Sequence, residues 1–153
     1  MNTKLKTKVQ VKLSASSESH SRTLLKTRDL IDVADEPEVR GGTNEGFAPT
    51  EMALASLMAC SNVISHKIAH KHGIEVVDMD FEMEATFNRL GVTLQEEVDV
   101  PFPEIKMTIS ITTPASDKEL QTLKDELPRF CPVDKLFTGA GTKVNTNWVV
   151  IRP

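Results

Sequence analysis

The sequence has little cysteine, no excess of positive charge and no long apolar run, and each shortage excludes a class of protein. Its 153 residues include 2 cysteines, too few for the disulfide framework of a small secreted domain. No stretch approaches the roughly 18 consecutive apolar residues that span a bilayer. A net charge of −4 gives no broad positive field for phosphates or anionic lipids. We therefore expect neither nucleic acid nor a membrane as a partner.

The first residues also lack the pattern of an export signal. MNTKLKTKVQVKLSASSE alternates lysine with apolar residues and contains no apolar run of signal-peptide length. Together with the shortage of cysteine, this pattern indicates a cytoplasmic protein. The length is typical of one domain with one core, and we predict a single domain over residues 1–153.

The N-terminal part reads as three strands followed by a loop. Apolar residues fall at every second position over residues 7–13, which predicts a strand. A serine-rich turn over Ser14–Ser21 then leads to two β-prone runs, residues 23–27 and 30–33. The glycines and asparagine of residues 35–46 predict a loop with positive φ angles.

The most apolar segment follows Pro49 and predicts a long central helix. It contains no further proline or glycine until Gly73, a residue suited to the position after a helix end. From Met52 to Cys60 the helix is apolar almost all round, apart from Ser56, so we expect burial on every side. One small sheet cannot cover that much surface, so a second helix or a second subunit should pack there.

The remaining sequence predicts two strands, two helices and a final strand. Apolar and acidic residues alternate over residues 77–87, and a similar alternation over 105–111 predicts an antiparallel partner. Ser116 and Glu119 have the spacing of a capping box for an amphipathic helix that ends at Pro128. Cys131 should cap a short helix over residues 133–137, and a strand over 143–151 completes an α+β fold.

Cys60 and Cys131 are the main candidates for chemistry, and the residues alone leave their role open. A free cysteine is commonly an inert, buried side chain, while a pair in a reducing compartment can also be a redox or metal device. Cys131 lies at a predicted helix N-terminus, where the dipole favours a thiolate. Cys60 lies in mid-helix and would need a neighbouring arginine.

Other patterns are weaker indications of a site. His66, His70 and His72 could suggest a metal site, but no HExxH motif accompanies them, and a polar helix flank explains them equally. The glycine-rich loop over residues 41–46 lacks the Lys-Ser/Thr ending of a phosphate-binding loop. No Gly-x-Ser-x-Gly sequence indicates a serine hydrolase.

Several short motifs occur in a combination that is recognisable. They are, in chain order, Asp35-Glu36-Pro37, Gly41-Gly42-Thr43, Ala48-Pro49-Thr50-Glu51 leading to Ala59-Cys60, and Cys131-Pro132-Val133. The whole chain resembles the OsmC/Ohr family of osmotically induced and organic-hydroperoxide-resistance proteins, nearest to its uncharacterised OsmC-like branch.

The resemblance implies both a fold and an activity. The fold would be α+β, with antiparallel sheets wrapped around the long central helices of an intertwined homodimer. The activity would be reduction of small apolar hydroperoxides without haem, flavin, metal or another bound cofactor. Cys60 would become a sulfenic acid, Cys131 would close a disulfide, and a protein carrying a dithiol such as a lipoyl group would reopen it.

The sequence departs from the family pattern at the carboxylate that holds the catalytic arginine. Thr50 occupies that position, and Glu51, one residue later, points about 100° away on a helix. The arginine itself should come from the early strands, with Arg22 as our candidate and Arg28 and Arg40 as rivals. Arg22 and Glu51 therefore join the two cysteines as predicted catalytic residues.

Three hypotheses follow for the function. The leading one is a cysteine-based organic hydroperoxide reductase that protects against oxidative stress. The second is a non-catalytic dimer of the same fold that binds an apolar ligand or a partner in the same cleft. The third is a protein that binds a metal through cysteine and histidine.

Overall fold

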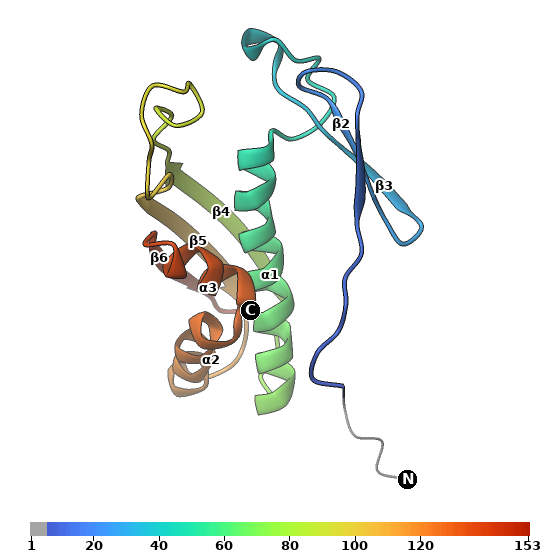
Figure 1. Ribbon diagram of the computed structural model, residues 1–153. Helices are drawn as coiled ribbons and strands as arrows, with labels where there is room; N and C mark the ends of the chain where they lie inside the picture. The colour runs from blue at the N-terminus through green and yellow to red at the C-terminus, as the bar shows by residue number, and fades with distance from the viewer. Residues whose placement is uncertain (1–5) are drawn as a thin grey trace. The chain divides into compact units, whose positions relative to one another are not determined.

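The computed structural model describes residues 6–153, and the chain divides into two compact units, Met1–Leu54 and Ala55–Pro153. Each unit is described by itself (Figure 1). The N-terminal unit contains β1 (Ser14–Ser17), β2 (Thr23–Thr27), β3 (Leu30–Ala34), the 3₁₀ turn η1 (Glu38–Arg40) and the start of α1 (Pro49–His72). The C-terminal unit contains the rest of α1 and then β4 (Asp78–Thr86), β5 (Glu104–Thr112), α2 (Asp117–Phe130), α3 (Pro132–Gly139) and β6 (Lys143–Ile151). The α+β prediction is confirmed.

The first strand lies later in the chain than its polarity pattern predicts. Strands β1, β2 and β3 form an antiparallel meander, in which β1 pairs with β2 from Ser17↔Thr23 to Ser14↔Lys26. Strand β2 ends one residue later, so the segment before Ser14 has no strand to pair with, and Val9 remains 77% exposed. The strand predicted over residues 7–13 is therefore wrong, and part of the predicted serine-rich turn is strand β1 itself.

A buried carboxylate organises the loop after β3. Asp35 is 0% exposed, and its carboxylate accepts hydrogen bonds from the N–H groups of Glu36 (2.8 Å), Thr43 (3.0 Å) and Glu45 (3.2 Å) and from the Thr43 hydroxyl (2.6 Å). The Thr43 hydroxyl, with these backbone donors, holds the pKa of Asp35 well below its usual range, against the effect of burial. Gly42 is required for this loop, since a Cβ there would lie 1.8 Å from the Glu36 carbonyl oxygen.

The C-terminal sheet presents one face to the helices. Strand β4 pairs antiparallel with β5, and β5 pairs parallel with β6. Alternate residues of β5, namely Ile105, Met107, Ile109 and Ile111, are at most 1% exposed. Helices α2 and α3 and the part of α1 from Ala55 onward cover this face (Figure 1). The alternation of β5 thus defines the core of this unit.

The predicted helices form, with one shifted end. The capping box of Ser116 and Glu119 is present at the start of α2, as its spacing predicts. Helix α2 does not end at Pro128 but continues to Phe130. A proline this close to a helix end removes one intrahelical hydrogen bond, and the Cys131 N–H still closes the last turn on the Leu127 carbonyl at 2.9 Å.

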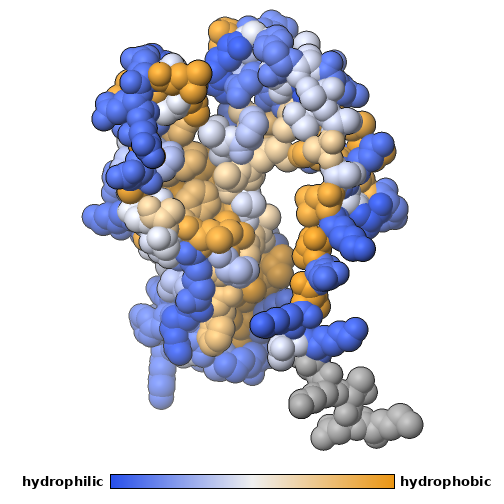
Figure 2. Space-filling model, viewed as in Figure 1, coloured by the Kyte–Doolittle hydropathy of each residue, from blue (hydrophilic) through white to orange (hydrophobic). Residues whose placement is uncertain are grey.

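Helix α1 does not bury its whole circumference within one chain. In the C-terminal unit its buried side chains are Leu57, Ser61, Ser65, Ile68 and Ala69, which share one face at helical spacing. Ala59 is exposed, Met58 and Cys60 are half-buried, and Figure 2 shows apolar side chains of this helix at the surface. Within a single chain this part of α1 is therefore not buried on every side, and its burial by a second subunit stays a prediction.

We predict that Asp35→Asn destabilises the N-terminal unit in a pH-dependent way. The folded-state pKa of Asp35 lies below its unfolded value, so its contribution to the free energy of unfolding is present above about pH 4 and declines as the pH falls further. Thermal unfolding should show a lower Tm for the variant at pH 7 and a shrinking difference from the parent protein toward about pH 2. Asp32→Asn, which changes an exposed carboxylate, serves as the control. If Asp35→Asn lowered the Tm by the same amount at every pH, the lowered pKa of Asp35 would not be the cause.

Candidate functional site: two neighbouring thiols

Cys131 lies at the junction of two helices, and the backbone fixes its position on both sides. Its N–H donates to the Leu127 carbonyl and closes α2, while its Sγ accepts the N–H of Asp134 at 3.5 Å as the N-cap of α3. Pro132 occupies the first position of α3, where a missing N–H costs nothing. The thiol is 0% exposed, so it is held rigidly within the core.

Cys60 lies beside this junction on α1. It is half-buried, and both cysteines are free thiols. The two side chains are close enough to influence each other, since Cys60 contributes to raising the pKa of Cys131. The structure thus places next to each other the two cysteines that the sequence analysis singled out.

The two thiols have different environments. Burial raises the pKa of Cys131, and the neighbouring Cys60 raises it further, while the N–H groups of Asp134 and Val133 act in the opposite direction. The net effect is a thiol that stays protonated more readily than a free cysteine. The N–H groups at the start of α3 favour the Cys131 thiolate, as its place at a helix N-terminus predicts, but desolvation outweighs them.

Asp134 is a further polar residue at this site that sequence analysis missed. It is 7% exposed, and burial raises the pKa of its carboxyl. Within residues 6–153, its carboxyl forms neither a hydrogen bond nor an ion pair; its polar contacts are made by its backbone. The available signal was its spacing, since an acidic residue three positions after an N-cap occupies the place of the carboxylate in a capping box.

Arg22 and Glu51 both lie in the N-terminal unit, with different partners. Arg22 forms ion pairs with Glu18 and with Glu45, whose Oε2 lies 2.8 Å from the arginine Nε. Glu51 instead accepts the Ala48 N–H at 2.9 Å and so caps the start of α1. Glu45 and Glu18, which the sequence analysis did not consider, are the carboxylates at Arg22, and a role for Arg22 at Cys60 stays a prediction.

Two of the α1 histidines named as possible metal ligands have hydrogen-bond partners within the protein. His66 Nδ1 lies 2.9 Å from the Asn62 carbonyl oxygen, and His72 Nε2 lies 3.2 Å from Glu126 on α2. In the described part of the chain, no three or more His, Cys, Asp or Glu residues are grouped so that they could hold a metal ion. Nothing in residues 6–153 thus adds to the metal hypothesis.

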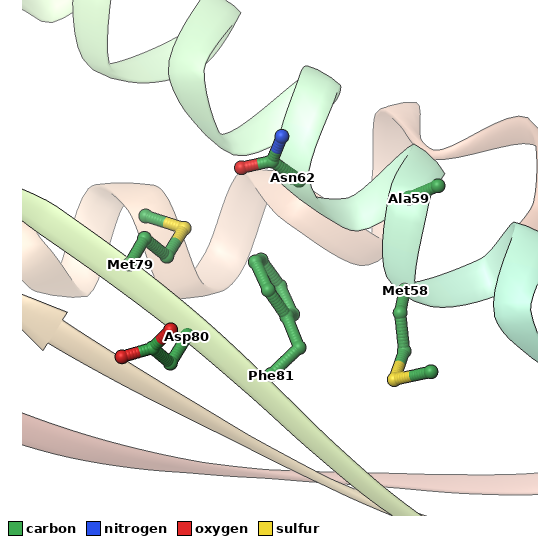
Figure 3. Close-up of a pocket in the computed structure, with 6 residues that line it drawn as sticks. All are labelled: Met58, Ala59, Asn62, Met79, Asp80 and Phe81. Atoms are coloured by element: carbon green, nitrogen blue, oxygen red, sulfur yellow. The ribbon is translucent and has the colours of Figure 1, made fainter.

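An open groove of about 390 Å³ separates α1 from β4 within the C-terminal unit. The helix contributes Met58, Ala59 and Asn62, and the strand contributes Met79, Asp80 and Phe81. Figure 3 shows the Phe81 and Met58 side chains directed into the space between helix and strand. The groove therefore combines apolar side chains with the polar Asn62 and Asp80, and Ala59 in its lining directly precedes Cys60.

Comparison with known proteins identifies the family. The family model for OsmC-like proteins matches residues 42–147, a range that includes both cysteines. The chain belongs to the OsmC-like family. A search of curated proteins gives no match.

Solved structures of OsmC-like proteins have the same fold at low sequence identity. An OsmC-like protein from Mycoplasma pneumoniae is 19% identical with a TM-score of 0.78, over 94% of this chain and 98% of that one. An organic hydroperoxide resistance protein from Elizabethkingia anophelis is 17% identical with a TM-score of 0.66, over 97% and 100%. The organic hydroperoxide resistance protein OhrB of Bacillus subtilis is 22% identical with a TM-score of 0.57, over 94% and 98%.

None of the helices within residues 6–153 has both the length and the apolar character that a membrane span requires.

Proposed function

We propose that the protein reduces organic hydroperoxides to alcohols with its two thiols, and so protects against oxidative stress. The observation that carries this proposal is the pair of neighbouring free thiols in an OsmC-like chain, one half-buried and one fully buried. Structural neighbours named as organic hydroperoxide resistance proteins support the choice of substrate class. No bound cofactor is needed for this chemistry.

The different environments of the two thiols support different roles for them in this proposal. Cys60 is the more accessible, so its thiolate attacks the distal oxygen of the hydroperoxide; the O–O bond breaks, an alcohol leaves, and Cys60 becomes a sulfenic acid. Cys131 then attacks that sulfur, and a disulfide and water form. An external dithiol protein, such as one carrying a lipoyl group, restores both thiols by exchange. Because Cys131 is buried with a raised pKa, it does not compete for the peroxide.

We predict dithiol-dependent consumption of cumene hydroperoxide by the purified protein. Cys60→Ser should abolish it, because no other thiol is accessible, and Cys131→Ser should stop after one turnover at the sulfenic acid or proceed to overoxidation. Lys67→Ala, at an exposed position further along α1, is the control and should stay active. Peroxide consumption is followed by a colorimetric assay, and the oxidation states by mass spectrometry.

If both thiols survive exposure to excess hydroperoxide, the proposal is wrong. The second hypothesis then takes its place, since the groove of Met58, Met79 and Phe81 offers an apolar surface for a ligand without any thiol chemistry.

We further propose that Arg22 promotes the thiolate of Cys60. A guanidinium stabilises a nearby thiolate, and Arg22 is itself held by Glu18 and Glu45. On a Cys131→Ser background, Arg22→Ala should move the pH midpoint of Cys60 alkylation upward by about one unit or more. Glu51→Gln should have a smaller effect, because Glu51 caps the helix instead. Arg40→Ala is the control, and an equal shift for both arginine variants would contradict the role of Arg22.

We also propose that a second copy of the chain covers the exposed side of α1. Met58, Met79 and Phe81 contribute apolar surface to the groove beside β4, and Val63, one turn beyond Ala59, is 49% exposed. Sedimentation should give twice the mass of the 16.9 kDa chain, and Val63→Asp should dissociate the dimer by placing a charge in the contact. A stable, folded monomer of the parent protein would contradict this proposal.

A further inference from the structure

A basic surface with an aromatic side chain lies where the end of α2 meets the end of α1. Phe130, the last residue of α2, is 52% exposed. Lys71 Nζ lies 5.9 Å from the centre of its ring, and Arg129 Cζ lies 5.6 Å from it. Each cation is therefore within the distance of a cation–π interaction. Lys71, Arg129 and Phe130 are all exposed, and together they form what we call the basic-aromatic patch.

A carboxylate on α2 holds the lysine of the patch in place. Glu126 Oε2 lies 3.5 Å from Lys71 Nζ, and Glu126 Oε1 lies 3.2 Å from His72 Nε2, so Glu126 links α2 to the last turn of α1 (Figure 1). The Glu126 side chain is only 15% exposed, whereas that of Lys71 is 62% exposed. The cation thus faces solvent far more than the carboxylate that holds it.

The positive charge of the patch is local. The chain as a whole carries a net charge of −4, yet no aspartate or glutamate occurs between Met52 and Gly73 on α1. Cations in the last turn of a helix interact favourably with its dipole, which accounts for the lysine and the arginine but not for the exposed ring that both contact. Arginine and aromatic residues are enriched at the centres of protein–protein interfaces. This composition fits an acidic partner that also offers an apolar contact.

The patch is also close to the two thiols along the chain. Phe130 directly precedes Cys131, and Lys71 follows Cys60 by eleven positions on α1. At about 100° and ~1.5 Å per residue, Lys71 and Cys60 lie within about 20° of the same helix face and roughly 16 Å apart along the axis. A protein bound at the patch therefore lies beside the face of α1 that carries Cys60.

Reduction of a disulfide between these thiols requires a reagent that reaches shielded sulfur atoms. Cys131 is 0% exposed and Cys60 is half-buried, so a folded protein cannot bring its own surface against the disulfide. A dithiol on a flexible arm can enter, provided that the protein carrying the arm is held nearby. The basic-aromatic patch offers a surface for holding it.

We propose that the basic-aromatic patch is the docking surface for an acidic protein that carries the reducing dithiol. This inference rests on the proposed function and goes beyond it by naming where the reductant binds and which charge it has. One sulfur of the dithiol attacks the Cys60–Cys131 disulfide and forms a mixed disulfide. Its second sulfur then closes a cyclic disulfide, and the two protons of the dithiol end on the two released protein thiols.

The test compares a carried dithiol with a free one. The carried dithiol is a lipoylated protein domain of net negative charge, kept reduced by its dehydrogenase. The free dithiol is dihydrolipoamide, which is uncharged. Turnover of cumene hydroperoxide is measured with each dithiol in turn. Because only the carrier can bind the patch, the parent protein should have a lower KM for the lipoylated domain than for dihydrolipoamide.

Two variants of the patch separate docking from chemistry. Arg129→Glu should raise the KM for the lipoylated domain about tenfold or more and leave kcat unchanged, because the reversed charge repels an acidic surface. Phe130→Ala should also raise this KM, because it removes the apolar contact. Neither variant should change the rate with dihydrolipoamide, which also shows that the variant is folded. Lys118→Glu makes the reverse charge change at an exposed position near the start of α2 and is the matched control.

Several outcomes would overturn the proposal. If Arg129→Glu and Lys118→Glu had the same KM for the lipoylated domain, the patch would not be the docking surface. A lower KM for Arg129→Glu would mean that the carrier does not bind through acidic groups. If Arg129→Glu changed the sedimentation of the protein, the patch would belong to a contact between two copies of the chain.

These results are distinguishable from a failure of the proposed function. In each of them dihydrolipoamide still supports turnover by the parent protein. If neither dithiol supported turnover, the proposed function itself would be contradicted, and this inference with it.

Discussion

The junction at Cys131 is the constraint on which the rest of the site depends. A single residue ends α2 through its N–H and begins α3 through its sulfur, so neither helix can move without moving the thiol. Both helices cover the apolar face of the C-terminal sheet (Figure 1), where β5 is almost completely buried. The packing of the core thereby holds one thiol in place, and the adjacent face of α1 brings the second one to it.

The same junction makes the two cysteines chemically different. Burial costs Cys131 its solvation and raises its pKa, while Cys60 on α1 remains partly accessible. This difference suits a reaction in which a solvent-accessible thiol attacks first and a thiol shielded from solvent attacks second. The junction also uses the Cys131 N–H for α2, so the Asp134 carboxyl, three residues later, has no capping bond within residues 6–153.

Sequence reasoning succeeded where local patterns are strong. Alternation predicted β4 and β5, and the spacing of Ser116 and Glu119 predicted the start of α2. It failed over residues 7–13, because a strand needs a partner and the pattern says nothing about where β2 ends.

The candidate site was predictable only in part, for similar reasons. Cys60 and Cys131 were found through motifs, since each has a recognisable sequence around it. The structural roles of Asp35, Glu45 and Asp134 were not predicted, because they depend on which N–H groups and charges surround these residues after folding. The net rise in the pKa of Cys131 was not predictable for the same reason, because a helix start alone does not reveal how deeply its first residue is buried.

The central claim is that Cys60 and Cys131 form one redox pair within one chain. The most direct measurement is peptide mapping after the reduced protein meets one equivalent of cumene hydroperoxide. We expect one Cys60–Cys131 disulfide within each chain, together with one equivalent of cumyl alcohol. Two free thiols, or a disulfide that joins Cys60 residues of two chains, would contradict it.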